Sequence, residues 1–450
     1  MIQPIQSRRL YEEMAYGSFP IANSYWRTTI ALPTHSPLDA PTYCDSVIIG
    51  AGYTGLNTAL ALAKAGQNVV VLDAQQPGWG ASGRNGGFCC LGGASLSLRR
   101  MLGRFGLNAA QEFLQTTRHA VDHVASLLET YSISADRHSH GETLMAHSAA
   151  SKKEMQNEIE DLRKLLGVQA TFLPKEELAE HGLCSKEFHG ALTVPIGFAI
   201  NPMKYVIGLA QAVLQSGVRI YGESPVTNIT QDYQGRHELT TPNGTVSAQN
   251  LIIATNGYSS ETVPAWLAGR VLPVQSSILV TRQLSPQELA DQGWTSRQMC
   301  YDSRKLLHYF RLLPDNRMLF GLRGSCRSTQ AAHNATKTRA RQDFDRMFPA
   351  WTHVETSHYW SGLVAIARNL TPFAGPVPGM NQTWGAMCYH GNGVAMGSYA
   401  GALLASQILG HGPKTPTLMT QPLRRFELGR WRRLILPLIY GWYEIRDRVL

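Results

Sequence analysis

The chain has 450 residues, of which 44% are hydrophobic and 16% charged, a balance that is typical of a folded protein with about two domains. Its net charge of +9 favours anionic ligands, but the basic residues form no stripe interleaved with aromatics, which argues against nucleic acid. No stretch of about 18 apolar residues, no secretory leader and no metal-ligand spacing of the cysteines is seen, so we expect a cytoplasmic protein without a transmembrane span or metal site.

Residues 1–40 show no periodic pattern and are expected to form an N-terminal arm. The clearest signal follows. An apolar run over 47–49 precedes Gly50-Ala51-Gly52-Tyr53-Thr54-Gly55, which fits G-x-G-x-x-G. A helical pattern over 56–65 and a second apolar run over 69–72 come next, and Asp73 ends that run. Strand, glycine turn, helix, strand and acid in this order predict a dinucleotide site.

Each residue type in this motif has a physical reason. Gly50 permits the tight turn, Gly52 lets the backbone approach a pyrophosphate, and Gly55 lets the helix lie close to the strand. The helix N-terminus offers free N–H groups to the anion. Asp73 follows Gly50 at the distance at which an acid bonds ribose hydroxyls, which disfavours NADP.

A second glycine-rich segment spans 78–87, with the sequence GWGASGRNGG. So many glycines beside a cofactor strand predict close approach of the backbone to a ligand rather than a flexible loop. Helices are expected over 108–131, over 152–166 with Ser151 as the cap, and over 201–217. Short strands over 218–220 and 226–229, a hairpin over 237–247 and an apolar strand over 251–257 indicate that the cofactor domain resumes.

Alternation predicts strands over 271–281 and 307–320, and in the second of these Tyr309 and Arg311 share one face. A third block opens at Trp360 and contains a strand, the turn 391–393 and a helix that runs to Gly410. The dipole of that helix would stabilise negative charge at the pyrimidine end of a reduced flavin.

The end of the chain combines arginines over 424–433 with an apolar run over 434–443 that Pro437 interrupts. This pattern is open to two interpretations, a tail packed on the body of the protein or an interfacial membrane segment. The run is short and interrupted, so we expect the packed tail.

Together these blocks resemble the FAD-dependent D-amino acid oxidase family, with its bacterial gamma-glutamylputrescine oxidoreductase branch nearest. The resemblance covers nearly the whole chain and rests on GAGYTG at 50–55, GWGASGRNGG at 78–87, YFRLLPDNRMLFG at 309–321, WSGL at 360–363, YHGNGVAMGSYAG at 389–401 and RDR at 446–448.

The resemblance implies an α/β fold (α+β overall) in which a Rossmann-like FAD domain is interleaved with a substrate domain on a mixed or antiparallel sheet, as in glycine oxidase. The FAD domain would comprise 41–95, 195–262 and 355–410. The substrate domain would comprise 96–194 and 263–354, and 411–450 would be a C-terminal tail.

The resemblance also implies the cofactor-binding residues. They are Gly50, Ala51, Gly52, Thr54, Gly55, Asp73, Ala74, Ser82, Gly83, Arg84, Asn85, Gly86, Gly87, Val226, Thr255, Asn256, Gly257, Gly391, Asn392, Gly393 and Val394. The FAD should be non-covalent, because the cysteine that tethers flavin in sarcosine oxidases, five residues before a Thr-Pro, is replaced by Ile366.

Amino-acid oxidases of this family carry an arginine for the substrate carboxylate two residues after the glycine of the tryptophan-glycine block. Here that position is Val364, which favours an amine over an α-amino acid. We therefore expect hydride transfer from the carbon beside the amine to flavin N5, with dioxygen or a quinone as the final acceptor. Tyr309, Arg311, His390 and Trp360 are the candidate catalytic residues, and Arg311 is expected to hold an acid distant from the amine, as in a γ-glutamylated polyamine.

Three alternatives stay open at this point. A D-amino acid or sarcosine-type oxidase would share the fold and the flavin. An NAD-dependent dehydrogenase would share the first glycine motif. A flavin-bearing RNA-modification or binding module belongs to another class and would need RNA contacts that the dispersed basic residues do not suggest.

Overall fold

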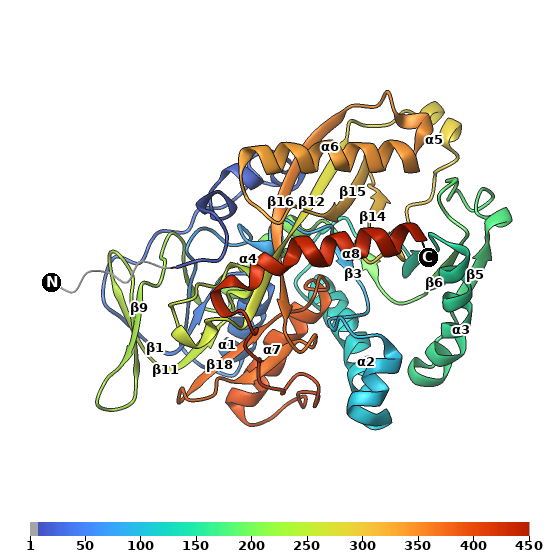
Figure 1. Cartoon of the computed structure of the whole chain (residues 1–450). Coiled ribbons are helices and arrows are strands. Elements are labelled where there is room, and N and C mark those ends of the chain that lie inside the picture. The colour runs from blue at the N-terminus through green and yellow to red at the C-terminus, as the bar shows by residue number, and fades with distance from the viewer. Residues whose placement is uncertain (1–7, 450) are drawn as a thin grey trace.

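The computed structural model describes residues 8–449, and its described strands form two large sheets and a small ribbon (Figure 1). The first seven residues of the expected arm lie outside the described residues. The rest of the arm contains three short 3-10 helices, Glu13–Tyr16, Phe19–Ile21 and Tyr25–Thr28. In the last of these, Trp26 is buried and donates its indole N–H to the backbone oxygen of Asn85 at 2.9 Å. The arm therefore supports the second glycine-rich segment.

The first sheet carries the dinucleotide motif and has the order β17-β18-β11-β1-β2-β8, with the β9–β10 hairpin joined to β11. Strands β11, β1, β2 and β8 are parallel neighbours. Val47 and Ile48 of β1 and all four residues of β2 are buried, as expected for a parallel sheet that is covered on both faces. Its strands are β1 Thr42–Ile49, β2 Val69–Leu72, β8 Arg219–Tyr221, β9 Asn228–Gln231, β10 His237–Thr240, β11 Thr245–Ile253, β17 Phe373–Pro376 and β18 Thr383–Met387.

The second sheet is mostly antiparallel and has the order β16-β12-β15-β14-β13-β4-β6-β5. An aromatic core that includes Phe310, Phe320, Phe344 and Trp351 lies between this sheet and helix α6. Its strands are β4 Glu142–Met145, β5 Thr171–Pro174, β6 Gly190–Val194, β12 Val271–Thr281, β13 Met299–Asp302, β14 Tyr309–Leu312, β15 Met318–Arg323 and β16 Thr356–Ala367. The ribbon pairs β3 Phe88–Cys89 with β7 Phe198–Ala199.

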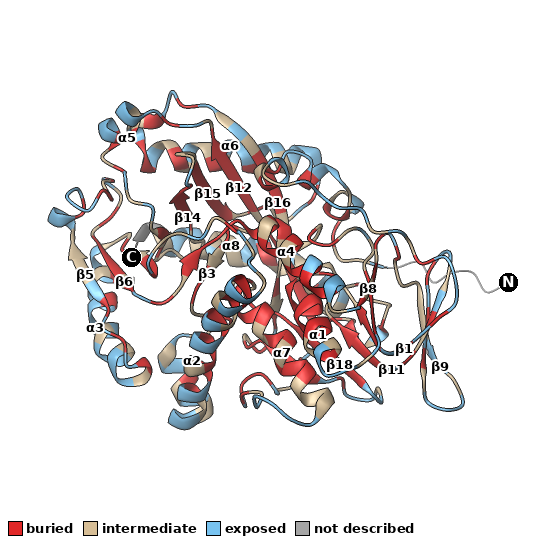
Figure 2. Cartoon of the chain, turned by 180° about the vertical axis from the view of Figure 1, so that it is seen from behind, coloured by how far each residue is buried: buried red, intermediate tan, exposed pale blue. Residues whose placement is uncertain are grey.

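Helices α1, α4 and α7 pack together beside the first sheet, and Figure 2 shows α1 and α7 largely buried there. The approach of α1 to α7 is close because Gly401 faces the backbone oxygen of Thr54, where an added Cβ would come within 2.4 Å. The described helices are α1 Tyr53–Lys64, α2 Leu98–Thr130, α3 Ala149–Leu166, α4 Pro202–Gln215, α5 Pro286–Gln292, α6 Gln330–Met347, α7 Ala395–Leu409 and α8 Leu436–Val449. No helix within residues 8–449 is long and apolar enough to span a membrane.

Most elements lie where the sequence predicts them. Helix α2 begins at Leu98, ten residues before the expected start at 108, and strands β4, β5 and β6 are not among the predicted elements. Three further differences concern a helix cap, a strand and a domain boundary. The cap of α3 is Ser148, whose hydroxyl accepts from the backbone N–H of Ser151, so the expected cap residue is one turn too late. The strands expected over 245–247 and 251–257 form one strand, β11. Strand β16 pairs with β12 in the second sheet, although the predicted boundary at 355 assigned it to the FAD domain; the domain limits remain a prediction.

Candidate active site

Two adjoining cavities lie between the sheets. The first, which we call the nucleotide cavity, has a volume of about 270 Å³ and is lined by the glycine turn 50–54, Asp73 and the segment 78–82. The second, which we call the substrate cavity, has a volume of about 280 Å³ and is lined by strands of the second sheet. Both cavities are lined by Ala81, Asn85, Leu363, Val364, His390, Gly391 and Val394, so these residues mark the place where the cavities meet.

The glycine turn 50–54 lines the nucleotide cavity. Gly50 has a φ of +111°, which favours glycine, and a Cβ at Gly55 would lie 1.9 Å from the Gly50 oxygen. A Cβ at Gly52 would come within 2.9 Å of the hydroxyl of Ser82. The absence of these side chains brings the N-terminus of α1 directly to the cavity, which is the arrangement that binds a pyrophosphate.

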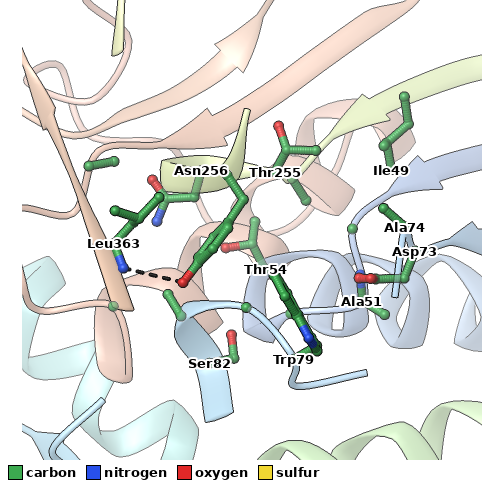
Figure 3. A pocket seen from close by; sticks show the side chains of 18 of the residues that line it. Ile49, Ala51, Thr54, Asp73, Ala74, Trp79, Ser82, Thr255, Asn256 and Leu363 are labelled. Carbon is green, nitrogen blue, oxygen red and sulfur yellow. Dashed lines mark hydrogen bonds between the residues drawn. The ribbon is translucent and has the colours of Figure 1, made fainter. Parts of the chain in front are cut away.

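Asp73 lies at one end of this cavity and Leu363 at the other (Figure 3). The Asp73 carboxylate accepts from the backbone N–H groups of Ala51 at 2.7 Å and Gln75 at 2.8 Å. A carboxylate has about four acceptor sites, so acceptor capacity remains for ribose hydroxyls. Burial raises the pKa of Asp73, and the two N–H donors oppose that shift.

Arg84 lines the substrate cavity next to Asn85, which lines both cavities. Its guanidinium is buried, lies 4.1 Å from the ring centroid of Trp79, and donates to the backbone oxygens of Trp79 and Ser361. Its second terminal nitrogen, Nη2, has no hydrogen-bond partner among residues 8–449. A buried cationic donor without a partner fits an anionic or carbonyl oxygen of a bound cofactor.

The turn 388–393 leads into α7 at the same junction. Cys388 and His390 both have positive φ angles, and the Asn256 side chain holds the turn by accepting from the N–H of Cys388 at 2.9 Å. Helix α7 then begins at Ala395, and the N–H of Gly397 donates to the oxygen of Gly393. The positive end of the α7 dipole therefore faces the junction, as expected for a site that stabilises a reduced flavin.

The substrate cavity crosses the second sheet from strand to strand. Six adjacent strands each contribute to its wall: β16 through Gly362, β12 through Ser276, β15 through Arg323, β14 through Tyr309, β13 through Tyr301 and β4 through Glu142. Neighbouring strands lie about 4.8 Å apart. The cavity is therefore elongated, and Arg323 and Glu142 are separated by three strand spacings, roughly 14 Å between their backbones.

Arg323 and Glu142 are the charged groups with opposite signs in this wall. Among the described residues, the Arg323 guanidinium makes no hydrogen bond and no ion pair, and its Nη2 lies 3.8 Å from where a Cβ of Gly391 would be. Glu142 is 4% exposed and accepts from the N–H of Leu91 at 3.2 Å. Burial raises the pKa of Glu142 to about 7, so its carboxyl titrates near neutral pH. Neither residue belongs to a motif that predicts a role for it from the sequence.

Tyr309 lies in the wall of the substrate cavity, as expected. Its hydroxyl is 2.9 Å from that of Ser276, and its ring packs over Gly86 and Gly321, where added Cβ atoms would come within 2.7 Å and 2.1 Å. Burial raises the pKa of Tyr309 to about 12, so the phenol remains protonated and can donate to a ligand.

The structure does not support the expected role of Arg311. Arg311 shares the strand face of Tyr309, but its guanidinium is 1% exposed behind the segment 86–87. It donates to the backbone oxygens of Gly86 and Ile200 and contacts His138 at 2.9 Å. These partners replace the carboxylate that we expected it to hold. Two acids close to Arg311 in the sequence are paired with other arginines, Asp302 with Arg304 and Asp315 with Arg317.

His390 and Trp360 are also fixed by the protein. The Nδ1 of His390 donates to the Gly93 oxygen at 2.9 Å and its Nε2 accepts from the N–H of Ala367, so the ring is neutral and fully bonded. Burial lowers the pKa of His390 to about 4. Trp360 is fully buried and donates to the Arg84 oxygen at 2.8 Å. Trp360 lines neither cavity and supports the fold, which corrects its expected catalytic role. His390 lines both cavities, and a catalytic role for it remains a prediction.

Most of the expected cofactor residues come together at these cavities. Those that line the nucleotide cavity are Gly50, Ala51, Gly52, Thr54, Asp73, Ala74, Ser82, Asn85, Val226, Thr255, Asn256, Gly391, Gly393 and Val394. Those that line the substrate cavity, some of them shared, are Arg84, Asn85, Gly86, Gly391, Asn392 and Val394. Those that line neither are Gly55, Gly83, Gly87 and Gly257. These four glycines instead let backbones approach each other, because an added Cβ would meet Gly50, Gly78, Ile200 and Leu363 respectively.

A βαβ glycine turn joined to an elongated cavity over an antiparallel sheet is the arrangement of a dinucleotide-dependent oxidoreductase, and the α7 dipole at the junction favours a flavin. The comparison with known families agrees. The family model described as FAD dependent oxidoreductase matches residues 45–407, and the chain belongs to this family. Its cofactor is FAD, which the glycine turn, Asp73, Arg84 and the N-terminus of α7 would hold. Bound FAD supplies a two-electron acceptor to the substrate cavity.

The chain is also similar to individual proteins of known sequence and to solved structures. It is 32% identical to the protein of Rhizobium meliloti (strain 1021) described as the probable oxidoreductase OrdL, over 90% of this chain and 92% of that one. It is 28% identical to the gamma-glutamylputrescine oxidoreductase of Escherichia coli (strain K12), over 90% of this chain and 93% of that one. The fold is similar to that of glycine oxidase from Geobacillus kaustophilus, with a TM-score of 0.70, 21% identity, and coverage of 86% of this chain and 99% of that one.

Proposed function

We propose that this enzyme oxidises an amine whose far end carries a carboxylate, such as a γ-glutamylated diamine. The observation that carries the proposal is the presence of Glu142 and Arg323 in one elongated cavity beside the FAD site. Their backbones are roughly 14 Å apart, so the two groups suit a substrate with separated charges better than an α-amino acid. The E. coli relative, whose name specifies gamma-glutamylputrescine, supports the same class of substrate.

The wall at Val364 supports an amine for a second reason. Val364 lines both cavities and stands where amino-acid oxidases of the family carry the carboxylate arginine. Arg323 lies on β15, two strands away from β16, or roughly 10 Å across the sheet. The positive charge of the wall is therefore displaced from the position that binds a carboxylate adjacent to the reacting carbon.

The chain's own residues would act on the amine in three ways. Glu142, ionised above about pH 7, would hold the ammonium group and accept its proton, because hydride leaves only from the carbon beside a neutral amine. Tyr309 would donate a hydrogen bond from the side of β14. Arg323 would hold the distant carboxylate. The product is an imine, which water hydrolyses to an aldehyde or ketone.

A substrate screen tests this proposal. The purified holoenzyme is mixed with γ-glutamylputrescine, putrescine, glycine, sarcosine and D-alanine, and turnover is scored by peroxide formation and by reduction of a quinone-like dye. We expect the highest kcat/KM for γ-glutamylputrescine, with the two assays separating dioxygen from a quinone as the acceptor. Preferred turnover of an α-amino acid would contradict the proposal and favour an amino-acid oxidase.

The pH dependence of kcat/KM should report Glu142. Its carboxyl must be ionised to accept a proton, and its pKa lies at about 7, so kcat/KM should rise as the pH increases through this value. Replacing Glu142 with glutamine should remove this rise of kcat/KM near pH 7 and lower kcat/KM about 100-fold. Without this base the amine must bind in its neutral form, so in Glu142→Gln a rise of kcat/KM should instead follow the deprotonation of the free amine at higher pH.

Glu158 provides a matched control for this measurement. The pKa of Glu158 is also raised, by partial desolvation and by the neighbouring acids Glu154 and Asp161, but Glu158 lies on the exposed face of α3 and outside both cavities. Glu158→Gln should leave the profile unchanged. If the Glu142→Gln variant still shows the rise of kcat/KM near pH 7, the proton acceptor is another group.

A further inference from the structure

The last helices of the chain expose an apolar stripe, which we define as Leu428, Trp431, Leu434, Leu438, Trp442 and Ile445. These side chains are 49–77% exposed, and they are half of the twelve large hydrophobic residues that are exposed within residues 8–449. Figure 1 shows α8 lying across the outside of the molecule, with nothing in front of it in that view.

The spacing of the stripe follows the local helix type. Residues 428, 431 and 434 recur every third position along the 3-10 helix Gly429–Ile435, which has three residues per turn. Residues 438, 442 and 445 recur every third or fourth position along α8, as one face of an α-helix does. The change of spacing with helix type keeps successive side chains of each helix on one line.

The opposite face of α8 is fastened to the body of the protein. Leu436 and Tyr440 pack on β12 and β16, and the carboxylate of Asp447 accepts from the backbone N–H groups of Lys305 and Leu306. At about 100° per residue, these three residues lie on the side opposite Leu438, Trp442 and Ile445. The stripe therefore cannot turn inward while α8 remains docked. The expectation of a packed tail is met by one face of the helix only.

The charges around the stripe are positive. Arg424, Arg425, Arg430 and Arg446 are exposed and form no ion pair with the described residues, and Arg430 lies 4.7 Å from the ring centroid of Trp431. The acidic residues of the same segment are engaged by the body, since Glu427 pairs with Arg368 and Glu444 with Arg339. An apolar line with exposed tryptophans and flanking arginines matches the interface of an anionic lipid bilayer.

We propose that this stripe docks the enzyme on the surface of a membrane that carries anionic lipids. The helix would lie in the plane of the interface, with the stripe among the acyl chains and the arginines at the phosphates. A second copy of the chain fits less well, because a two-fold contact through the same patch would bring arginines against arginines.

A membrane bound at this face would lie close to the active site. Asp447 holds the loop between β13 and β14, and Leu307 in that loop lines the substrate cavity. The lipid surface would therefore contact a helix that fixes one wall of the cavity.

Sedimentation of the holoenzyme with vesicles tests the proposal. We expect at least about tenfold more enzyme bound to vesicles of phosphatidylglycerol and phosphatidylcholine than to phosphatidylcholine alone, with the difference reduced by salt. The double variant Leu438→Glu, Trp442→Glu should lose at least about tenfold in binding, because it places charges among the acyl chains. The double variant Arg430→Glu, Arg446→Glu should lose the preference for anionic lipid.

A matched control uses two exposed apolar residues away from the stripe. Leu107 and Tyr233 are 57% and 94% exposed, so Leu107→Glu, Tyr233→Glu should bind vesicles as the wild type does. All variants should retain their flavin absorbance, which shows that they fold. Absence of vesicle binding, or equal binding of the stripe variant, would overturn the proposal. A lipid-free dimer that the stripe variant dissociates would assign the stripe to a second copy instead.

Discussion

Replacing Arg323 with leucine is expected to raise the KM for γ-glutamylputrescine about 10- to 150-fold, the loss of charge-assisted hydrogen bonds worth about 1.5–3 kcal/mol. The reason is the free guanidinium in the wall of the substrate cavity, which forms no hydrogen bond with the described residues. Putrescine has no carboxylate, so its KM should change by less than about twofold. Steady-state kinetics with both amines measure the difference.

Two other arginines make this experiment specific. Arg327 is exposed, follows the same strand and lies outside both cavities, so Arg327→Leu should leave both KM values unchanged. Arg311 holds the backbone of Gly86 and Ile200, so Arg311→Leu should impair both substrates together and lower the melting temperature. An equal loss for both amines in Arg323→Leu would mean that Arg323 supports the fold, and the carboxylate site would have to lie elsewhere.

Replacing Gly55 with alanine is expected to weaken FAD binding at least about tenfold and to destabilise the protein by about 1–3 kcal/mol. The added Cβ would lie 1.9 Å from the backbone oxygen of Gly50 and 3.1 Å from the side chain of Ile48. Because the first contact is with backbone, helix α1 must move away from the sheet, and its N-terminus must move with it. Flavin absorbance after acid release measures the occupancy, and a melting curve measures the stability.

Gly103 is the matched control, because it is also a helical glycine but an added Cβ there would meet no atom within 4 Å. Gly103→Ala should bind FAD normally and melt at the same temperature or higher, since alanine is the better helix former. If Gly55→Ala retains full flavin content and stability, then close packing of α1 on β1 is not what positions the cofactor.

The sequence determined the cofactor site by itself because that site is built from local features. A turn at Gly50, a helix that begins three residues later and an acid at the end of the next strand are neighbours in sequence, and each has its own propensity or steric requirement. The same holds for the turn before α7, where Gly391 and Gly393 precede an apolar helix. These patterns can be identified without knowing how the strands pair.

The substrate cavity was decided only by the tertiary structure. Glu142 and Arg323 lie 181 residues apart in the sequence and line one cavity because β4 and β15 belong to one sheet, an arrangement set by long-range pairing. The strand alternation correctly put Tyr309 and Arg311 on one face, but only the packing of the segment 86–87 buried Arg311 and left Tyr309 in the cavity. Strand periodicity gives the face of a side chain, whereas the elements that cover that face decide whether it binds a ligand or supports the fold.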